Sequence, residues 1–598
     1  MKTFIHTFLL FVAVTVNAEV IPTNNRIDWD NAGYQRLSDD PHLIVNVMDF
    51  GAQANGISDD RMAIENAILS LKGHSGVVYL PAGTYLLQSG LTLPDSVVVR
   101  GAGSEFTFVK INGAVDCFTI NGSSTNKFTS ILSGFEFNSN SITVKNPKLF
   151  AIGNYVEIRE VNGSWDTKPA SWANKVVGQI SKIIDIIGDT LILEDKLRTS
   201  YESNLNPEIQ KITPREHVRI ENLYIERINT SKEGTTNNFQ FCYAVNCMIS
   251  GVESSRSQGS HAKISLSSHI EITGSYFHHS FMYDGIGTKG YGVVLDTHSG
   301  LCLVSNNIFR HLRHAMMTKD GANGNVFAYN YSTDVYRNGT NEFPSDFAGD
   351  ISLHGHYSFA NLFEGNIVQN LVIDEYWGPS GQRNTFFRNR VENYGVFMST
   401  TQTNNTNFVG NEVIGSIPYG FFMIKGTGNF IFANNRNGNI YPTTTSQLSD
   451  SSYHYKTIPS YWDIPDKWPS IGIGNSLNEG TIPAKNRFNS GIYTVSSEEL
   501  ISGATKIINI KPNIYNNLEV IPNPASQYVY VDIDSSGNMN ANLIFTDMNG
   551  KIMKHGDFYF TQKGKIRKTI DISGFYAGVY FMKLTTENGI FTKKLIVR

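Results

Sequence analysis

The chain has 598 residues, a formal net charge of −4, 40% hydrophobic residues and 17% charged residues. This length favours more than one domain, and the composition is that of a folded protein with a sizeable core rather than a disordered chain. The slight acidic excess argues against a nucleic-acid partner, because nucleic-acid-binding domains usually carry surplus Lys and Arg.

The first residues predict an export signal. Lys2 precedes an apolar run from Phe8 to Val16, which is followed by the small residue Ala18. A positive start, a short apolar run and small residues are typical of a secretory signal peptide, and the run is shorter than the ~20 residues of a membrane span. We therefore expect a signal peptide at 1–18, a protein that is secreted or attached to the cell surface, and no transmembrane segment.

The segment 45–105 combines a short helical pattern with strands that end in sharp turns. Its landmarks are Asp49-Phe50-Gly51-Ala52, Asn55-Gly56, Asp59-Asp60, the apolar positions Ala63, Ile64, Ala67 and Ile68, and Leu80-Pro81-Ala82-Gly83-Thr84-Tyr85. The apolar spacing predicts a helix that caps one end of the fold, with Asp59 or Asp60 near its N-cap. The series is similar to the opening of the pectate-lyase-like superfamily. That resemblance implies an all-β, right-handed parallel β-helix, a fold that glycoside hydrolases, lyases, epimerases and phage tailspikes share, so it leaves the activity open.

The middle of the chain carries a repeat that independently predicts a β-solenoid. An alternating apolar stretch closes six times on an asparagine: Asn307, Asn330, Asn366, Asn389, Asn411 and Asn434. Successive copies are 23, 36, 23, 22 and 23 residues apart, and the long interval contains the polar stretch Arg337–Asp350. Such a period is expected of solenoid coils, whose asparagines stack at a turn and tolerate left-handed backbone there. We expect the β-helix domain at 19–510, a β-rich insertion at 142–214, and the end of the solenoid with a linker within 440–517.

Residues 518–598 differ in character from the repeat. They contain Pro522-Asn523-Pro524, the turn Asn549-Gly550, the strand Gly578–Leu584 and a basic final strand, Lys593–Arg598. Short alternating strands with an Asn-Gly turn predict a small antiparallel β-sandwich. The segment also resembles the C-terminal sorting domain of type IX secretion, which implies that the domain is an export address and that the type IX machinery is a partner.

Polar residues of neighbouring coils are predicted to meet on one side of the solenoid, because equivalent positions stack about 4.8 Å apart. They lie upstream of the ladder asparagines and form four pairs: Asp296 and His298, Lys319 and Asp320, His354 and His356, and Asp374 and Glu375. The fourth pair is further from its asparagine, so it can belong to the adjoining strand instead. Carboxylates, imidazoles and a lysine in one place are typical of acid–base catalysis.

We predict that this cluster cuts an acidic polysaccharide, either uronate-containing or sulfated. The predicted catalytic residues are Asp320, Asp374, Glu375, His354, His356 and Lys319, and the predicted substrate-binding residues are Asp296, His298, Tyr376, Trp377, Arg383 and Tyr357. Glycoside hydrolysis needs one carboxylic acid and one carboxylate, and carboxylates outnumber arginines in the cluster, which favours a hydrolase that requires no cofactor. The stretch Arg337–Asp350 is expected to wall one side of the groove.

Two other functions remain open. A polysaccharide lyase would use Lys319, His354, His356 or Tyr376 as the base for β-elimination, with Ca²⁺ held by Asp296 and Asp320 as one option. A non-catalytic, glycan-binding solenoid would show aromatic and Asn/Thr ladders without a concentrated acid–base set. His354 and His356 would share one face of a strand, but no third ligand follows at a metal-site spacing, so no metal site is predicted.

Overall fold

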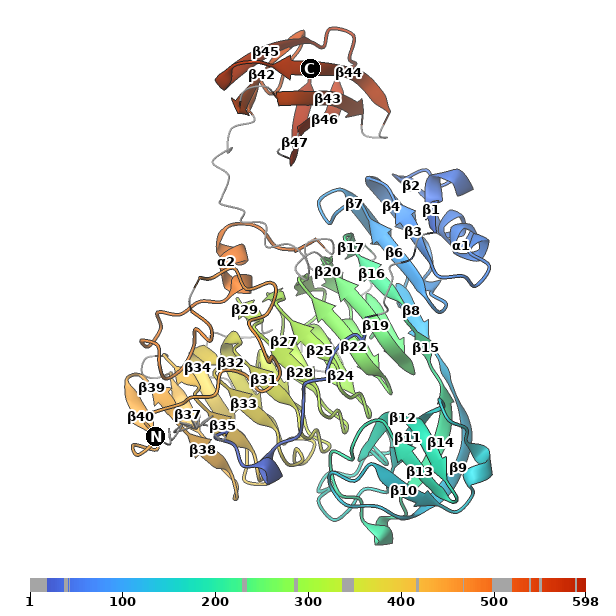
Figure 1. Ribbon diagram of the computed structural model, residues 1–598, viewed down its shortest axis with the longest axis vertical. Helices are drawn as coiled ribbons and strands as arrows, with labels where there is room; N and C mark the ends of the chain where they lie inside the picture. Colours follow the sequence, from blue (N-terminus) through green and yellow to red (C-terminus); the bar gives the residue numbers. More distant parts are fainter. Residues whose placement is uncertain are drawn as a thin grey trace, which may run out of the picture.

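The computed structural model describes residues 19–36, 41, 43–228, 234–283, 289–335, 349–415, 419–465, 467–496, 519–536, 539–547, 551–586 and 589–598. The predicted signal peptide, the linker and most of Arg337–Asp350 lie outside these residues. Two long parallel sheets form the body of the protein (Figure 1). No helix in the described ranges has the length and apolar character that a membrane span requires.

The first sheet stacks one strand from each coil. Its strands in order are β1 (Ile44–Asn46), β3 (Gly76–Leu80), β6 (Val97–Gly101), β16 (Arg219–Glu221), β19 (Ala244–Ser250), β22 (Ser268–Thr273), β25 (Leu303–Ser305), β28 (Val326–Ala328), β31 (Leu362–Glu364), β33 (Thr385–Phe387), β35 (Asn407–Val409) and β38 (Phe430–Phe432), with β15 (Arg215–Glu216) beside β19.

The second sheet takes two strands from most coils. Its strands are β2 (Asn55–Asp59), β4 (Gly83–Leu87), β5 (Leu91–Thr92), β7 (Thr107–Ile111), β8 (Phe118–Asn121), β17 (Tyr224–Arg227), β18 (Phe239–Cys242), β20 (Glu253–Ser257), β21 (Ser260–Ser265), β23 (Tyr276–Ser280), β24 (Tyr291–Asp296), β26 (Ile308–Arg310), β27 (His314–Thr318), β29 (Tyr331–Thr333), β30 (Ile351–Leu353), β32 (Ile367–Ile373), β34 (Arg390–Met398), β36 (Glu412–Val413), β37 (Phe421–Met423), β39 (Asn434–Arg436) and β40 (Asn439–Tyr441). Parallel pairing at each step, except between β39 and β40, gives the parallel β-helix.

The repeated asparagines form one buried ladder at the corner between the two sheets. Asn330 is typical: both its backbone N–H and its side-chain amide donate to Asn366 Oδ1, at 3.0 and 2.9 Å. The left-handed backbone lies one residue earlier than expected, for example at Tyr329 with φ +55° and at Gly365 with φ +64°. The ladder asparagines therefore serve through their amides, which satisfy buried backbone groups from coil to coil.

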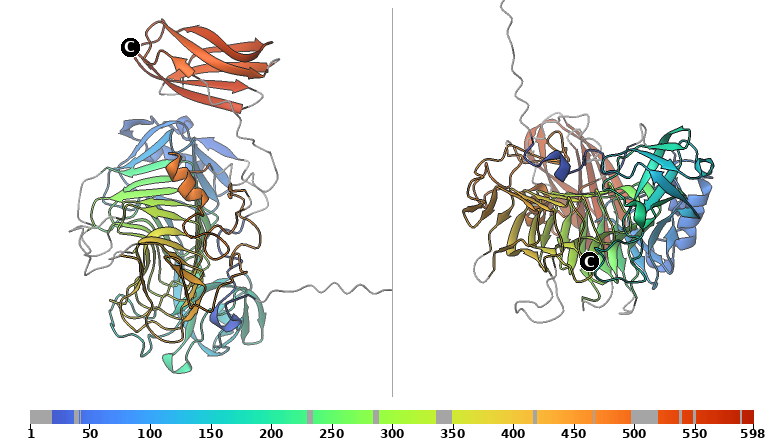
Figure 2. Two further views of the ribbon diagram at one scale, coloured as in Figure 1. Left: turned by 90° about the vertical axis from the view of Figure 1, so that its left-hand side faces the viewer. Right: turned by 90° about the horizontal axis from the view of Figure 1, so that it is seen from below.

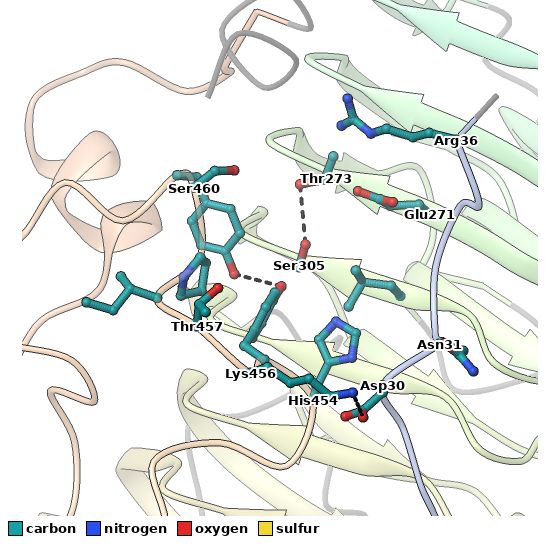
Figure 3. A pocket seen from close by; sticks show the side chains of 15 residues that line it. Asp30, Asn31, Arg36, Glu271, Thr273, Ser305, His454, Lys456, Thr457 and Ser460 are labelled. Carbon is teal, nitrogen blue, oxygen red and sulfur yellow. Dashed lines mark hydrogen bonds and ion pairs between the residues drawn. The ribbon is translucent and has the colours of Figure 1, made fainter. Parts of the chain in front are cut away.

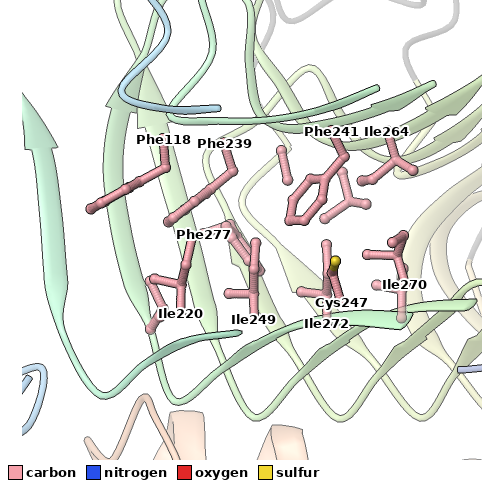
Figure 4. Close-up of a cluster of buried hydrophobic side chains, with 14 of the residues drawn as sticks. Phe118, Ile220, Phe239, Phe241, Cys247, Ile249, Ile264, Ile270, Ile272 and Phe277 are labelled. Atoms are coloured by element: carbon pink, nitrogen blue, oxygen red, sulfur yellow. The ribbon is translucent and has the colours of Figure 1, made fainter. Parts of the chain in front are cut away.

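Stacked apolar side chains fill the interior of the β-helix. Phe327, Phe363, Phe386 and Phe408 are fully buried and their rings stack in sequence at centroid distances of 5.0, 5.1 and 5.2 Å. Figure 4 shows the same arrangement in earlier coils, where Phe118 and Phe239 lie side by side with nearly parallel rings. Parallel register repeats each inward position at the next coil, so identical residue types stack.

Helix α1 (Arg61–Ser70) lies beside β1 and β3, at one end of the first sheet (Figure 1). Its four predicted apolar positions, Ala63, Ile64, Ala67 and Ile68, are all buried against the interior cluster. Asp60 occupies the N-cap position, and its carboxylate accepts hydrogen bonds from the backbone of the preceding turn, at Gln53 and Ala54. The Asp60 carboxylate therefore stabilises the backbone turn at this end of the β-helix by accepting its hydrogen bonds.

A closed six-stranded barrel interrupts the β-helix. Its strands are β9 (Ser123–Ser133), β10 (Ser141–Val144), β11 (Tyr155–Arg159), β12 (Gly178–Ile187), β13 (Thr190–Leu193) and β14 (Glu208–Thr213), with the short turns η3 (Pro147–Leu149) and η4 (Ser203–Leu205). The barrel therefore begins about twenty residues before the expected start at Ile142. It encloses its own apolar core and protrudes from one side of the β-helix (Figures 1 and 2).

Two irregular segments cover the outer face of the first sheet. Residues 19–36, with the short helix η1 (Thr23–Asn25), bury Trp29, whose indole N–H donates to Ala360 O at 2.8 Å. The expectation that 440–517 finish the solenoid is wrong for 442–496, which follow the last strand and run back over the coils with α2 (Pro483–Asn489). Arg487, for instance, donates to Asn306 Oδ1 and O at 2.6 and 2.7 Å. The two segments remove from water the apolar side chains that point outward from the first sheet, which stabilises the fold.

The C-terminal residues form two antiparallel sheets around one apolar core. The sheets contain β41 (Glu519–Ile521), β42 (Tyr528–Ser536) and β45 (Lys563–Asp571) on one side, and β44 (Ile552–Phe560), β43 (Met539–Asp547), β46 (Gly578–Thr586) and β47 (Gly589–Val597) on the other. Val531, Leu543, Phe545 and Met582 are among the buried residues that the two sheets share. Alternating strands need a second layer to bury their apolar face, which two short sheets provide.

Candidate functional site

The predicted polar residues form a continuous row along the carboxyl ends of second-sheet strands. Partners in register include Ser265 with Asp296, Leu295 with Thr318, Thr318 with Leu353, and Leu353 with Ile373. One residue further along each strand stand Asp296, Lys319, His354 and Asp374, followed by Ser399 on the next coil. Asp374 therefore belongs to this row and not to the adjoining strand, and we call these five residues, together with Asp320, the acid–base row.

Alternating charges hold the row together. Lys319 Nζ lies 2.9 Å from Asp320 Oδ2 and 3.9 Å from Asp296 Oδ2. His354 Nδ1 lies 2.6 Å from Asp374 Oδ2. Asp296 also accepts a hydrogen bond from Ser265 and lies 3.3 Å from Lys263 Nζ. Each carboxylate of the row thus has a basic partner on its own coil or an adjacent one, as stacking at ~4.8 Å permits.

The same contacts set the protonation of the row. Burial lowers the pKa of Lys319, but the carboxylates of Asp320 and Asp296 outweigh burial and raise that pKa above its usual value. Burial raises the pKa of Asp320, but Lys319 and His356 outweigh it and lower the pKa below its usual range. For Asp374, burial is outweighed in the same way by His354. Near neutral pH Asp320 and Asp374 are therefore ionised and Lys319 is protonated.

The barrel lies directly against the row, because the chain leaves the β-helix after Asn121, which stands in register with Cys242 and thus on the same corner. His356 pairs with Asp320 at 3.5 Å and its Nε2 lies 3.2 Å from Lys168 O of a barrel loop. Gly321 has φ +74°, and a Cβ there would lie 1.6 Å from Val176 O, so only glycine lets the barrel backbone come this close to Asp320.

The barrel contributes an aromatic residue that the sequence did not reveal as part of the site. Trp172 is 55% exposed, its ring lies 5.2 Å from that of Trp377 and 5.0 Å from that of His356, and Lys319 Nζ lies 5.5 Å from the Trp172 ring centre. Tyr376 is 68% exposed and its ring contacts Trp377 at 5.0 Å. Three aromatic rings thus line the exposed side of the acid–base row, where flat apolar faces suit sugar rings.

Four residues named from the sequence lie in neither the row nor the group of aromatic and imidazole rings beside it. Glu375 is buried, and its carboxylate accepts hydrogen bonds from the backbone of Thr400 and Thr403, so it organises the next turn. His298 is buried between the β-helix and the barrel, with Nδ1 3.1 Å from Glu157 Oε1.

Arg383 and Tyr357 are likewise engaged elsewhere. Arg383 donates to Asn24 O at 2.9 Å and lies 3.7 Å from the Phe137 ring centre. The Tyr357 ring packs on Trp165 at 4.6 Å, between the barrel core and the apolar cluster on the outside of the first sheet. These contacts attach the N-terminal segment and the barrel to the β-helix, so they give no support to the predicted sugar contacts.

The predicted calcium ligands do not suit a cation. The oxygens of Asp296 contact Ser265, Lys263 and Lys319, and those of Asp320 contact Lys319 and His356. A Ca²⁺ ion would have to displace two lysines from these oxygens. Within the described ranges, no three His, Cys, Asp or Glu side chains converge as metal ligands.

The assumption that His354 and His356 alternate on one strand is wrong. Strand β30 ends at Leu353, and the next residues turn, with φ +77° at Gly355 and +45° at His356. The two imidazoles therefore reach different carboxylates, Asp374 and Asp320. Strand geometry alone would have placed both on one face.

Comparisons with known proteins match the two ends of the chain most specifically. Residues 44–168 match the family model described as rhamnogalacturonase A/epimerase, pectate lyase-like, and residues 519–598 match the secretion system C-terminal sorting domain. A 74-residue stretch is 43% identical to the mannuronan C5-epimerase AlgE6 of Azotobacter vinelandii, covering 11% of this chain and 8% of that protein. A 72-residue stretch is 38% identical to the preneck appendage protein of Bacillus phage PZA, covering 12% and 8%. The chain thus spans less than a tenth of either relative.

Solved structures with similar coordinates include a phage protein and an enzyme. The tailspike gp49 of Pseudomonas phage LKA1 has a TM-score of 0.46 at 13% identity, over 62% of this chain and 64% of that one. An exopolygalacturonase of Thermotoga maritima has a TM-score of 0.30 at 13% identity, over 68% and 95%. The sorting domain indicates export through type IX secretion, to the cell surface or beyond. The chain therefore carries a pectate-lyase-like segment at residues 44–168 and a secretion system C-terminal sorting domain at 519–598.

Proposed function

We propose that the protein cleaves glycosidic bonds of an acidic polysaccharide outside the cell. The acid–base row beside three aromatic rings is the observation that carries this proposal. A sugar chain lying along the carboxyl ends of the second-sheet strands would place one residue on Trp172 and Trp377 and its neighbour on the row. The match with a pectate-lyase-like family model and the similarity of a short stretch to a mannuronan C5-epimerase support this class of substrate.

A lysine at the end of the row favours an acidic glycan. Lys319 and Lys263 already pair with Asp320 and Asp296, whereas Lys425 Nζ lies 3.0 Å from the Ser399 carbonyl and adds a positive charge. A uronate carboxylate or a sulfate group approaching these side chains gains charge-assisted hydrogen bonds. The substrate class we propose is therefore a polymer with uronate or sulfate groups.

Hydrolysis is the reaction we place first. Its two groups would be Asp374 and Asp320, one of which activates water or attacks the anomeric carbon. Because the pKa of each is lowered, both enter the reaction ionised, and His354, the partly exposed histidine of the row, would protonate the leaving oxygen. The hydrolase requires no further group for this chemistry.

A second candidate, β-elimination, is favoured by the pairing of His354 with Asp374. A carboxylate 2.6 Å from Nδ1 orients the imidazole as a base for the C5 proton of a uronate. Protonated Lys319, on the adjacent coil, would neutralise the uronate carboxylate and stabilise the negative charge that develops on it. Elimination thus uses the same row, but removal of the C5 proton replaces the attack of water on the glycosidic bond. Its product is an unsaturated sugar.

One assay distinguishes these reactions. Mature protein is incubated with acidic plant and algal polysaccharides, and reducing ends, ultraviolet absorbance of unsaturated uronates and deuterium uptake from D₂O are followed together, with His354→Ala and Asp374→Ala as controls. Reducing ends without absorbance would support hydrolysis, and equal growth of both would support elimination. Deuterium uptake without cleavage would indicate that the protein is a C5 epimerase and does not cleave the polymer. Tight glycan binding with none of the three signals would indicate a non-catalytic binding protein.

A further inference from the structure

A hollow lies on the outer face of the first sheet, away from the acid–base row (Figure 3). A cavity of about 590 Å³ opens between β22, β25 and the two covering segments, at 30–36 and 454–461. Glu271 and Thr273 stand in register with Leu303 and Ser305, and all four point outward because the intervening residues face the core. The volume falls within the roughly 300–1,000 Å³ of small-molecule sites.

One wall of this cavity is a run of hydroxyl groups. Tyr461 donates to the Tyr455 hydroxyl at 3.0 Å, Tyr455 also hydrogen-bonds to Ser305, and Ser305 Oγ donates to Thr273 Oγ1 at 3.3 Å. Burial raises the pKa of both tyrosines well above the usual value, so their hydroxyls stay protonated. Hydroxyls that both donate and accept suit a ligand that does the same.

The charged groups of the cavity balance one another. Lys456 Nζ lies 2.5 Å from Asp30 Oδ2, which joins the two covering segments. The Glu271 carboxylate accepts one hydrogen bond, from Tyr34 N at 3.2 Å; burial raises its pKa and the positive charge of Arg36 partly offsets this. The acids Asp30 and Glu271 are matched by the bases Lys456 and Arg36, so the cavity has no excess positive charge that would attract an anion. The Glu271 carboxylate would repel an anionic ligand.

We propose that this cavity binds an uncharged saccharide unit. Sugar hydroxyls would donate to Glu271 and exchange hydrogen bonds with Ser305 and Thr273, while the rings of Tyr455 and Tyr461 offer flat apolar faces. The cavity faces away from the second sheet, so bound sugar would tether the protein to a glycan without occupying the acid–base row. This inference goes beyond the proposed cleavage reaction and does not depend on it.

The test uses the full mature chain with Asp374→Ala, so that no bound sugar is turned over. An array of cellohexaose, mannohexaose, xylohexaose and maltohexaose, with hexagalacturonate and hexamannuronate as charged counterparts, identifies what is retained, and titration calorimetry gives the Kd. Glu271→Ala and Tyr461→Phe are compared with Asp95→Ala, an acidic side chain that is 52% exposed and pairs with Arg215 outside the cavity.

We expect at least one uncharged hexasaccharide to bind. Glu271→Ala should weaken its Kd about tenfold or more, since a hydrogen bond to a charged group is lost, and Asp95→Ala should leave it unchanged. Tyr461→Phe removes one oxygen and keeps the fold, so it should weaken the Kd several-fold even if Glu271→Ala does not fold. Retention of the charged hexasaccharides alone, or of no sugar at all, or a Kd that neither variant changes twofold, would overturn the proposal.

Discussion

His354 Nδ1 lies 2.6 Å from Asp374 Oδ2, although the two residues belong to successive coils and are twenty positions apart in the chain. Parallel register creates the contact: Leu353 pairs with Ile373, and the next residue on each strand points to the same side. In this contact His354 lowers the pKa of Asp374, and the Asp374 carboxylate orients the imidazole. A His–Asp ion pair whose two side chains are partly exposed at the edge of the solenoid is suited to moving a proton to or from a bound sugar.

Removal of either partner of this pair should abolish turnover. His354→Ala and Asp374→Asn are each expected to lower kcat by 10²- to 10⁴-fold, the usual contribution of a positioned acid or base. His311→Ala is the matched control, because His311 Nδ1 lies 3.2 Å from Asp334 in another turn. Steady-state kinetics on the polysaccharide found in the assay above give the comparison, and a His354→Ala enzyme within twofold of wild type would remove this pair from the mechanism.

Acid should destabilise the fold through the same carboxylates. The folded-state pKa values of Asp320 and Asp374 lie below the unfolded value of about 3.9, so their stabilising contribution is complete above that pH and is lost as the pH falls through the folded values. Urea unfolding between pH 2 and 6 should show a free energy that falls on acidification below about pH 4. Asp374→Asn should flatten this fall, and the exposed Asp95→Asn should not; equal slopes in all three proteins would contradict the coupling.

Lys319 should contribute strongly to stability. Lys319→Met leaves the buried Asp320 and Asp296 without their shared cation, which is expected to cost about 3–5 kcal/mol in the free energy of unfolding. Asp320→Asn added to Lys319→Met should recover part of this loss, because one buried charge is removed as well. A double-mutant cycle by urea unfolding measures the coupling, and additive single effects would show that the pair does not interact.

Trp172 should affect binding more than turnover. Loss of the ring in Trp172→Ala removes a stacking face beside Trp377, and we expect KM to rise about 5- to 30-fold while kcat changes less than threefold. Ile187→Ala, which changes another exposed apolar residue of the barrel, should leave both constants unchanged. A large fall in kcat with constant KM would instead place Trp172 in the chemistry.

The asparagine ladder should be a major determinant of stability. Asn366→Ala removes one acceptor for Asn330 and two donations, to Phe327 O and to Asn389 Oδ1, all in a fully buried corner. Buried groups left unpaired cost about 1–3 kcal/mol each, so we expect a loss of at least about 3 kcal/mol. Thermal unfolding of both variants measures the change. Asn112→Ala, which changes an exposed asparagine, should alter the free energy of unfolding by no more than about 0.5 kcal/mol.

The sequence by itself determined the parts that depend on local pattern and on coil spacing. The repeat of about 23 residues predicts both the asparagine ladder and the stacking of Asp296, Lys319 and His354, because in a parallel solenoid equal spacing means contact. It left open whether Asp374 joins them, and the register of Leu353 with Ile373 decided that. Helix α1 follows from its apolar period and the C-terminal sheets from their alternation. In the coils each residue's neighbours are one repeat away along the chain, and in the helix and the C-terminal strands the apolar period is local, so the spacing of residues in the sequence predicts these features.

Only the tertiary structure decided how the non-repeating parts pack on the coils. It placed Trp172 beside the row, used His298 and Tyr357 to attach the barrel, and turned Glu375 into an acceptor for the following loop. It also folded residues 442–496 back over the first sheet, which creates the cavity on the outer face of that sheet. The contacts of the barrel and the walls of this cavity join segments more than a hundred residues apart without a repeat between them, so they depend on the docking of surfaces, which no spacing in the sequence encodes.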